Sequence, residues 1–164
     1  MSDTTISITL YGEELLLDIR NKSDQELAGV ADTQQRYSSV AGRDKDEDVK
    51  RSLQEAYHYL RSLCHEFLTV TNDNSVDDRP QGITEDSTLT LALTLAGRRD
   101  GSQLQEGIAN AMHAYLVEKT LELYYGSSPA RDLSVLHAAR AAVNGDEVQR
   151  LLYRRRKPNY TQYT

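Results

Sequence analysis

The four histidines of this 164-residue chain, His58, His65, His113 and His137, are the side chains best suited to bind a metal or transfer a proton. A shared metal site needs ligands whose spacing brings them to one point, as in a helical HExxH motif. His58 and His65 lie two helical turns apart, and no HExxH spacing occurs. We therefore expect structural or surface roles for the histidines, with no metal and no other cofactor bound.

Nucleophiles and acids are present without the patterns that make them catalytic. The chain lacks a GxSxG nucleophile elbow, a Walker phosphate loop and a GxGxxG turn. Its acids gather in residues 44–48 and 73–86, where solvation explains them, and the alternating pattern of a calcium-binding EF-hand is missing. Cys64 is the single cysteine, so no intramolecular disulfide or thiolate pair can form, and its apolar neighbours predict burial. We expect the protein not to be an enzyme.

The basic end of the chain is the best sequence candidate for binding a partner. Residues 149–164 hold five cations and no acid, so residues 1–148 carry a charge of −11 while the whole chain carries −6. The predicted partner-binding residues are Arg150, Tyr153, Arg154, Arg155, Arg156, Lys157, Tyr160 and Tyr163. An acidic body with a basic end indicates pairing with copies of itself or with an oppositely charged partner. The alternatives are nucleic-acid binding and simple compensation of a helix C-terminus.

Hydrophobic periodicity predicts a mainly helical α+β protein: a bundle of three long helices and one short helix, with two short amphipathic strands. Alternation of apolar and polar residues predicts strands over Ile6–Leu10 and Leu89–Leu95. The predicted helices cover residues 13–27, 44–70, 102–125 and 129–156, the last of them either continuous through Gly145 or broken there. Ser102 and Gln105 have the spacing of a capping box, and Leu133, Leu136, Val143, Val148, Leu151 and Leu152 are predicted to form one apolar stripe.

The predicted elements make one helical domain, residues 1–157, followed by an extended tail, residues 158–164. Residues 30–43 are predicted to be a loop, and the polar, acidic loop 71–87 is predicted to be ordered only in an assembly. Two strands alone make a marginal sheet whose free edges invite pairing with another chain. The start of the chain lacks the pattern of a signal peptide, and no apolar run approaches the ~20 residues that span a bilayer. We therefore expect synthesis in the cytosol and no membrane contact.

The segment LLLDIRNKSDQELAG, residues 15–29, resembles an "L-Y-D-I-x-N-K" segment of small proteins encoded among the virion genes of Bacteroidales tailed phages and prophages. Three later blocks are similar in order and spacing, namely STLTLALTL (87–95), IANAMHAYLVEKTLELYY (108–125) and RLLYRRRKP (150–158). Two positions depart from that pattern, because Leu16 replaces an aromatic residue and Tyr124–Tyr125 stand where the pattern has Trp. Neither departure removes a catalytic group.

The resemblance implies a structural role in the virion, as a head–tail connector or adaptor that forms a ring in the neck between portal and tail. Its implied partners are copies of itself, the portal and other neck or tail proteins, with nucleic acid limited to DNA that passes through the ring. Ring contacts would use the helix faces of residues 44–70 and 129–156, and residues 150–164 would dock on an adjacent ring. Assembly would take place in the cytoplasm of the bacterial host. A tail-completion protein and a nucleic-acid-binding or regulatory module are the alternatives.

Overall fold

A computed structural model describes residues 3–28, 43–69, 82–95, 101–127 and 131–153. The elements follow in the order β1 (Thr4–Tyr11), α1 (Gly12–Ala28), α2 (Arg43–Leu63), a 3-10 turn (His65–Phe67), β2 (Thr88–Leu95), α3 (Gly101–Gly126) and α4 (Arg131–Tyr153). Helices α2, α3 and α4 have 21, 26 and 23 residues, and α1 has 17. The predicted class, mainly helical with a small two-stranded sheet, is confirmed.

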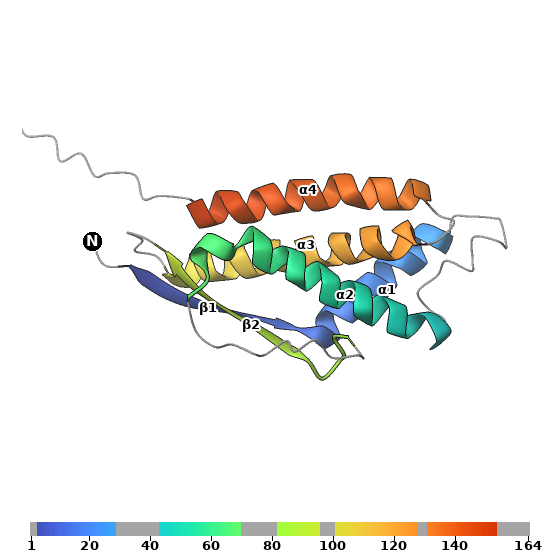
Figure 1. Cartoon of the computed structure of the whole chain (residues 1–164), viewed down its shortest axis with the longest axis horizontal. Helices are drawn as coiled ribbons and strands as arrows, with labels where there is room; N and C mark the ends of the chain where they lie inside the picture. Colours follow the sequence, from blue (N-terminus) through green and yellow to red (C-terminus); the bar gives the residue numbers. More distant parts are fainter. Residues whose placement is uncertain (1–2, 29–42, 70–81, 96–100, 128–130, 154–164) are drawn as a thin grey trace, which may run out of the picture.

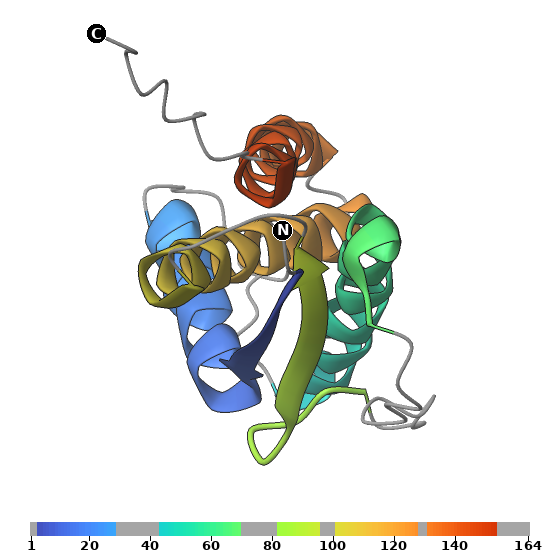
Figure 2. The same cartoon turned by 90° about the vertical axis from the view of Figure 1, so that its left-hand side faces the viewer.

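Helix α3 is the central element of the fold (Figure 1). It contacts α4, α2, α1 and β1, so that neighbours cover most of its circumference. Figure 2 shows α4 on one side of α3, with the sheet, α1 and α2 around its other sides. A helix that is covered all round must be apolar all round. The buried residues of α3 accordingly include Ile108, Met112, Tyr115, Leu116, Val117, Leu121, Tyr124 and Tyr125.

The two predicted strands form and pair with each other in antiparallel orientation, with Ile8 opposite Leu91. Side chains alternate between the two faces of a strand, and one face of this sheet lies in the core. The buried face consists of Ile6, Ile8, Leu10, Leu89, Leu91, Leu93 and Leu95. Because the strands satisfy each other along their shared edge, only their two outer edges remain for other contacts.

Gly12 lets β1 pass into α1 without a connecting loop. Its N–H donates to the carbonyl of Ser87 at 2.8 Å, which continues the β1–β2 ladder by one residue. A Cβ at this position would lie 2.1 Å from the Thr84 carbonyl oxygen, so a side chain does not fit. Residues 82–87 of the predicted acidic loop are packed here, since Ile83 is buried and its N–H donates to the Lys50 carbonyl at 3.3 Å.

Two sequence-based predictions of local structure are wrong. The helix predicted over residues 44–70 ends at Leu63, because the chain turns through His65–Phe67 and brings Leu68 beside Leu93 of β2 in an isolated antiparallel bridge. Apolar residues beyond Leu63 therefore serve a sheet edge and not a helix face. The capping box is also wrong, because α3 begins at Gly101, before the predicted cap Ser102, and the side-chain amide of Gln105 donates to the carbonyl of Ser7 in β1.

Several predicted features fall outside the described residues: most of loops 30–43 and 71–87, the Pro129 start of the last helix, and the tail 158–164. The last predicted helix is continuous through Gly145 and is described as far as Tyr153. Within the described ranges, no helix combines the length and the apolar character that crossing a membrane requires.

Candidate functional site

Helix α4 packs on α3 through a face built from small residues. Ala141 and Gly145 are buried at the middle of this face, with His137 on one side and Val148 on the other. A Cβ on Gly145 would lie 3.3 Å from the ring of Tyr115 in α3, so the glycine permits a close approach of the two helices. Small residues at a helix contact reduce the interaxial distance, and this explains why the sequence keeps Gly inside a helix despite its low propensity.

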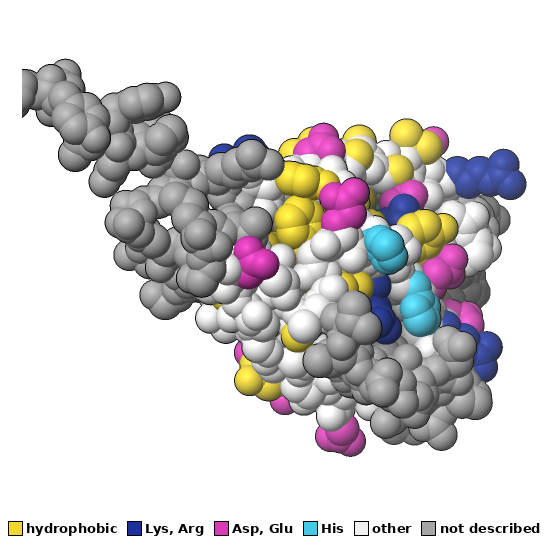
Figure 3. Space-filling view, turned by 60° about the vertical axis from the view of Figure 1, so that its left-hand side comes forward, with side chains coloured by type: hydrophobic (Ala, Val, Ile, Leu, Met, Phe, Trp, Pro, Cys, Tyr) yellow, Lys and Arg dark blue, Asp and Glu magenta, His cyan; other side chains and the backbone are white. Residues whose placement is uncertain are grey.

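The opposite face of α4 is apolar and exposed. Val135 is 72% exposed, Val143 68% and Leu136 42%, and the exposed Ala139 and Ala142 lie between them. Their spacing of three, four and seven residues places them on one side of a helix. The upper rim of Figure 3, where α4 lies, shows hydrophobic side chains among charged ones. We call Val135, Leu136, Ala139, Ala142 and Val143 the outer face of α4.

This arrangement corrects the predicted single apolar stripe on the last helix. Val148, Leu151 and Leu152 are buried as that stripe requires, but Leu136 and Val143 point outward. The helix has two apolar sides, one packed on α3 and one largely exposed. Soluble helices usually carry polar residues on the side away from the core, so an apolar second side marks an interaction surface.

The C-terminal end of α4 contains two of the predicted partner-binding residues. The Arg150 guanidinium forms a two-pronged ion pair with Glu147, with N–O distances of 2.8 and 2.6 Å. The Tyr153 hydroxyl donates to Glu66 at 2.5 Å, and its ring packs edge-on against Phe67. The Tyr153 contacts fix the end of α4 to the 3-10 turn, whereas the Arg150 pair lies within α4, and both side chains remain exposed. The other six predicted residues, Arg154–Lys157, Tyr160 and Tyr163, lie outside the described residues.

A buried polar cluster connects α4 with α3 and α1, and sequence reasoning missed it. His137 of α4 is fully buried, with Nδ1 hydrogen-bonded to Glu118 of α3 and Nε2 2.8 Å from Glu26 of α1. The Lys22 ammonium pairs with the second oxygen of Glu118. The imidazole ring stacks on Tyr125, with ring centroids 5.6 Å apart. One histidine therefore joins three helices whose residues are far apart in the sequence.

The electrostatics of the cluster are those of a paired buried carboxylate. Burial by itself would raise the pKa of Glu118, but hydrogen bonds from His137 and Lys22 outweigh it, and the pKa of Glu118 lies below its ordinary value of 4.5. Each imidazole nitrogen faces a carboxylate oxygen, so each can donate a hydrogen bond when the ring is protonated. The cluster lies in the helix contact and not in a cleft, and we assign it a structural role.

A second polar cluster joins α1, α2 and the turn that precedes β2. Arg20 binds Asp46 and, at 2.9 Å, Glu85. Lys50 binds the same two carboxylates at 2.8 and 3.3 Å. Burial raises the pKa of Asp46, but the hydrogen bonds from Lys50 and Arg20 lower it by more, so its net shift is downward. The acids of the predicted N-terminal turn thus include one, Asp46, that binds within the molecule.

In the part of the chain that the structure describes, the groups suited to chemistry lie apart from one another. Cys64 is buried as predicted, and burial raises the pKa of its thiol to about 12, far from the value of a nucleophile. His113 is hydrogen-bonded to the exposed Asp18 at 2.6 Å. Among the described residues, no group of three or more His, Cys, Asp or Glu side chains is placed to hold a metal ion.

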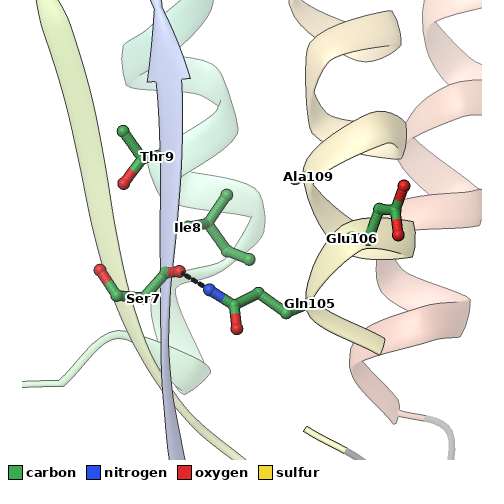
Figure 4. Close-up of a pocket in the computed structure, with 6 residues that line it drawn as sticks. All are labelled: Ser7, Ile8, Thr9, Gln105, Glu106 and Ala109. Atoms are coloured by element: carbon green, nitrogen blue, oxygen red, sulfur yellow. Dashed lines mark hydrogen bonds between the residues drawn. The ribbon is translucent and has the colours of Figure 1, made fainter. Parts of the chain in front are cut away.

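A groove lies between the outer edge of β1 and the start of α3 (Figure 4). Its lining comes from three consecutive residues of the strand and from one side of the helix, and its volume is about 300 Å³. The lining residues are Ser7, Ile8, Thr9, Gln105, Glu106 and Ala109. The groove is open and mixed in polarity, and it exposes strand backbone, so it is better suited to a polypeptide than to a small molecule.

Comparisons with protein-family models, with curated proteins and with solved structures find no match to this chain. The case for a function therefore depends on the residues and on their arrangement.

Proposed function

We propose that the protein is a non-enzymatic structural subunit that assembles with copies of itself into a ring, as a head–tail connector in the neck of a tailed phage. The outer face of α4 is the observation that supports assembly, and the resemblance of residues 15–29 and the later blocks supports the place in the virion. Burying exposed aliphatic side chains stabilises a contact by about 1.5–3 kcal/mol for each side chain fully covered.

The surroundings of the outer face carry charges of both signs, which a contact surface on the next copy must complement. Arg131, Arg140 and Arg150 are exposed beside the apolar residues, as are Asp132 and Asp146, and Arg140 and Arg150 also pair with acids of their own molecule. The exposed side of α2 carries the acids Glu47, Asp48 and Glu55 with Arg51 among them, together with Tyr59, which is 45% exposed and has the Lys119 ammonium over its ring. Such a surface offers acids to the arginines and one aromatic ring to the apolar residues.

The two surfaces lie on different sides of the molecule, with α4 at the top and α2 at the right of Figure 2. A contact between α4 of one copy and α2 of the next is therefore heterologous, because the two copies use different patches. Heterologous contacts close into rings when the rotation between copies is a whole fraction of a turn. This geometry is in keeping with the ring that we propose.

Replacing Val143 by Asp tests the role of the outer face. The side chain is 68% exposed, so the substitution should leave the fold intact, while a charge in the centre of an apolar contact weakens association at least tenfold. Analytical ultracentrifugation over a range of concentrations measures the association. The matched control is Asn110→Asp, which introduces the same charge at an exposed position of α3 away from the outer face. Equal association of the wild type and both variants would contradict the proposal.

The virion role needs a separate experiment. We expect mass spectrometry of purified phage particles to detect the protein, and electron cryomicroscopy to place a ring of it between the portal and the tail. The regulatory alternative predicts that the protein is absent from particles, and the tail-completion alternative predicts density at the tail side of the neck.

A further inference from the structure

The hydrogen bonds of β1 show which of its backbone groups point away from β2, toward the outer edge of the sheet. The carbonyl of Ser7 accepts from Gln105 in α3, so it points away from β2. Its cross-strand partner Ala92 likewise directs its carbonyl outward, where it accepts from the N–H of Thr69 at 2.9 Å. In an antiparallel pair the N–H and C=O of one residue point to the same side, and consecutive residues alternate. Ser7 and Ala92 therefore form a non-hydrogen-bonded pair, and their backbone groups face the two outer edges.

Every second residue of β1 points its backbone N–H and C=O in the same direction as Ser7. The backbone groups of Thr5, Ser7, Thr9 and Tyr11 face the outer edge, and their side chains lie on or near the exposed face of the sheet. On the β2 side the edge is already contacted by Leu68 and Thr69. On the β1 side the described residues supply one hydrogen bond to the outward backbone groups, from the Gln105 amide to Ser7, beside the groove of Figure 4. The β1 edge is thus a strand acceptor with little of its hydrogen-bonding capacity used.

We propose that the β1 edge binds residues 158–164 of a second copy as an added antiparallel strand, an inference that rests on the self-assembly proposed above. The segment, Pro-Asn-Tyr-Thr-Gln-Tyr-Thr, contains two Tyr and two Thr, residue types favoured in strands, and no acid. Strand addition obtains its affinity from main-chain hydrogen bonds and its specificity from alternate side chains, which here meet the groove between Thr9 and Ala109.

The position of α4 explains why the strand comes from a second copy. The Tyr153–Phe67 contact holds the end of α4 beside the 3-10 turn. Leu68, which follows that turn, pairs with Leu93, and this part of β2 lies opposite the Thr4 end of β1. The end of α4 is therefore near the start of β1. Figure 1 likewise shows α4 ending on the side where β1 begins. A segment that reached β1 of its own molecule from there would run parallel to it. Antiparallel pairing, which is the more stable per residue, is open to a segment arriving from another copy.

Charge complementarity supports the antiparallel orientation. In that orientation the residues before the added strand, Arg154–Lys157, lie beside the far end of β1, where α1 begins. Glu13 and Glu14 are exposed in the first turn of α1. Four cations would therefore meet two exposed acids. A parallel orientation would place the four cations at the Thr4 end, where Asp3 is the neighbouring acid in the sequence.

Disulfide trapping between two full-length variants tests the inference. One carries Thr9→Cys and the other Gln162→Cys. Adjacent strands bring Cα atoms to about 4.5–5.5 Å, within the range of a disulfide. The native Cys64 does not interfere, because it is buried and its thiol pKa is about 12. We expect a cross-linked dimer when the two variants are mixed under mild oxidation, and more than a tenfold lower yield when either is mixed with wild type. An equally low yield from the mixture of the two cysteine variants would overturn the inference.

Two further variants exclude other origins of a cross-link. Adding Ser7→Pro to the Thr9→Cys chain removes an outward N–H, a change that edge strands accept, whereas Ser7→Ala keeps the N–H. We expect the proline to abolish the cross-link and the alanine to preserve it. Adding Glu13→Lys and Glu14→Lys should lower the yield several-fold, while the control Glu55→Lys on α2 should not. A cross-link that survives the proline, or one that forms within a single chain carrying both cysteines at high dilution, would overturn the inference. Sedimentation of the Ser7→Pro variant reports α4-mediated association separately, so the two proposals can fail independently.

Discussion

Replacing His137 by Leu should destabilise the protein far more than any replacement of an exposed histidine. The substitution leaves Glu118, which is 4% exposed, without one of its two hydrogen-bonding partners, and leaves Glu26 with Arg140 at 3.4 Å. Taking a hydrogen-bond donor away from a buried carboxylate costs about 1–3 kcal/mol or more, and Lys22 still binds Glu118 in the variant, so we expect a loss of about 3 kcal/mol. Small domains have a free energy of unfolding of about 5–15 kcal/mol, so this loss is a large fraction of the total.

His113 provides the matched control. It too is hydrogen-bonded to a carboxylate, Asp18, but the two side chains are 23% and 55% exposed. Exposed ion pairs contribute about 0–1 kcal/mol, so His113→Leu should have a small effect. Urea denaturation followed by circular dichroism at pH 7 measures both free energies of unfolding. A His137→Leu variant within 1 kcal/mol of the His113→Leu variant would refute the assigned role of the cluster.

The pH dependence gives a second, independent test. The pKa of Glu118 in the folded protein lies below its ordinary 4.5, so its stabilising contribution is complete above that pH and is lost as the pH falls through the folded value. In the His137→Leu variant, burial is opposed by Lys22 alone, and the carboxyl group protonates more readily. The difference between wild type and variant should therefore be largest at neutral pH and should shrink at pH 4. A difference that is constant or grows over this range would contradict the reasoning.

Other expectations follow from single positions. Gly12→Ala would place a Cβ 2.1 Å from the Thr84 carbonyl, and we expect it to lower the free energy of unfolding by about 3 kcal/mol. Gly107→Ala, with nothing within 4 Å of the new Cβ, should instead raise it by up to about 1 kcal/mol through helix propensity; thermal unfolding of both variants measures the contrast. Cys64 should react with Ellman's reagent only after denaturant is added, because it is buried and its thiol pKa is about 12; rapid reaction of the native protein would contradict its burial.

The sequence pattern alone predicted an element correctly where apolar residues recur at one fixed spacing. Alternation at Ile6, Ile8 and Leu10 identified β1 because half of its side chains enter the core and the other half face outward. The same rule failed past Leu63, where Phe67 and Leu68 continue the apolar composition but pack against a sheet edge. Apolar composition reports burial, and it does not report which element buries the residue.

The polar cluster and the outer face of α4 were harder to predict, because the role of each residue depends on partners that are far away in the sequence. Glu118 lies 19 residues from His137, and Lys22 lies 96 residues from Glu118, so no local spacing links them. A usable signal existed, since Glu118 interrupts an apolar helix and His137 lies among small residues of another. The two sides of α4 were merged into one stripe for a related reason. Leu136 and Val148 are both apolar, and only the contact with α3 shows that one is covered and the other is not.

The polar cluster and the outer face of α4 explain each other. A helix that is apolar on two sides can in principle be rotated about its axis to pack through either side, here the outer one with Val135, Leu136 and Val143 or the inner one with Val148, Leu151 and Leu152. His137 selects the inner side, because rotation would move its ring away from Glu118 and Glu26 and leave Glu118 with Lys22 and Glu26 with Arg140. Burying a charged cluster gains less free energy than an apolar contact of similar volume, but it determines which side of α4 faces α3. A subunit that must present an apolar helix face to its neighbours needs this constraint.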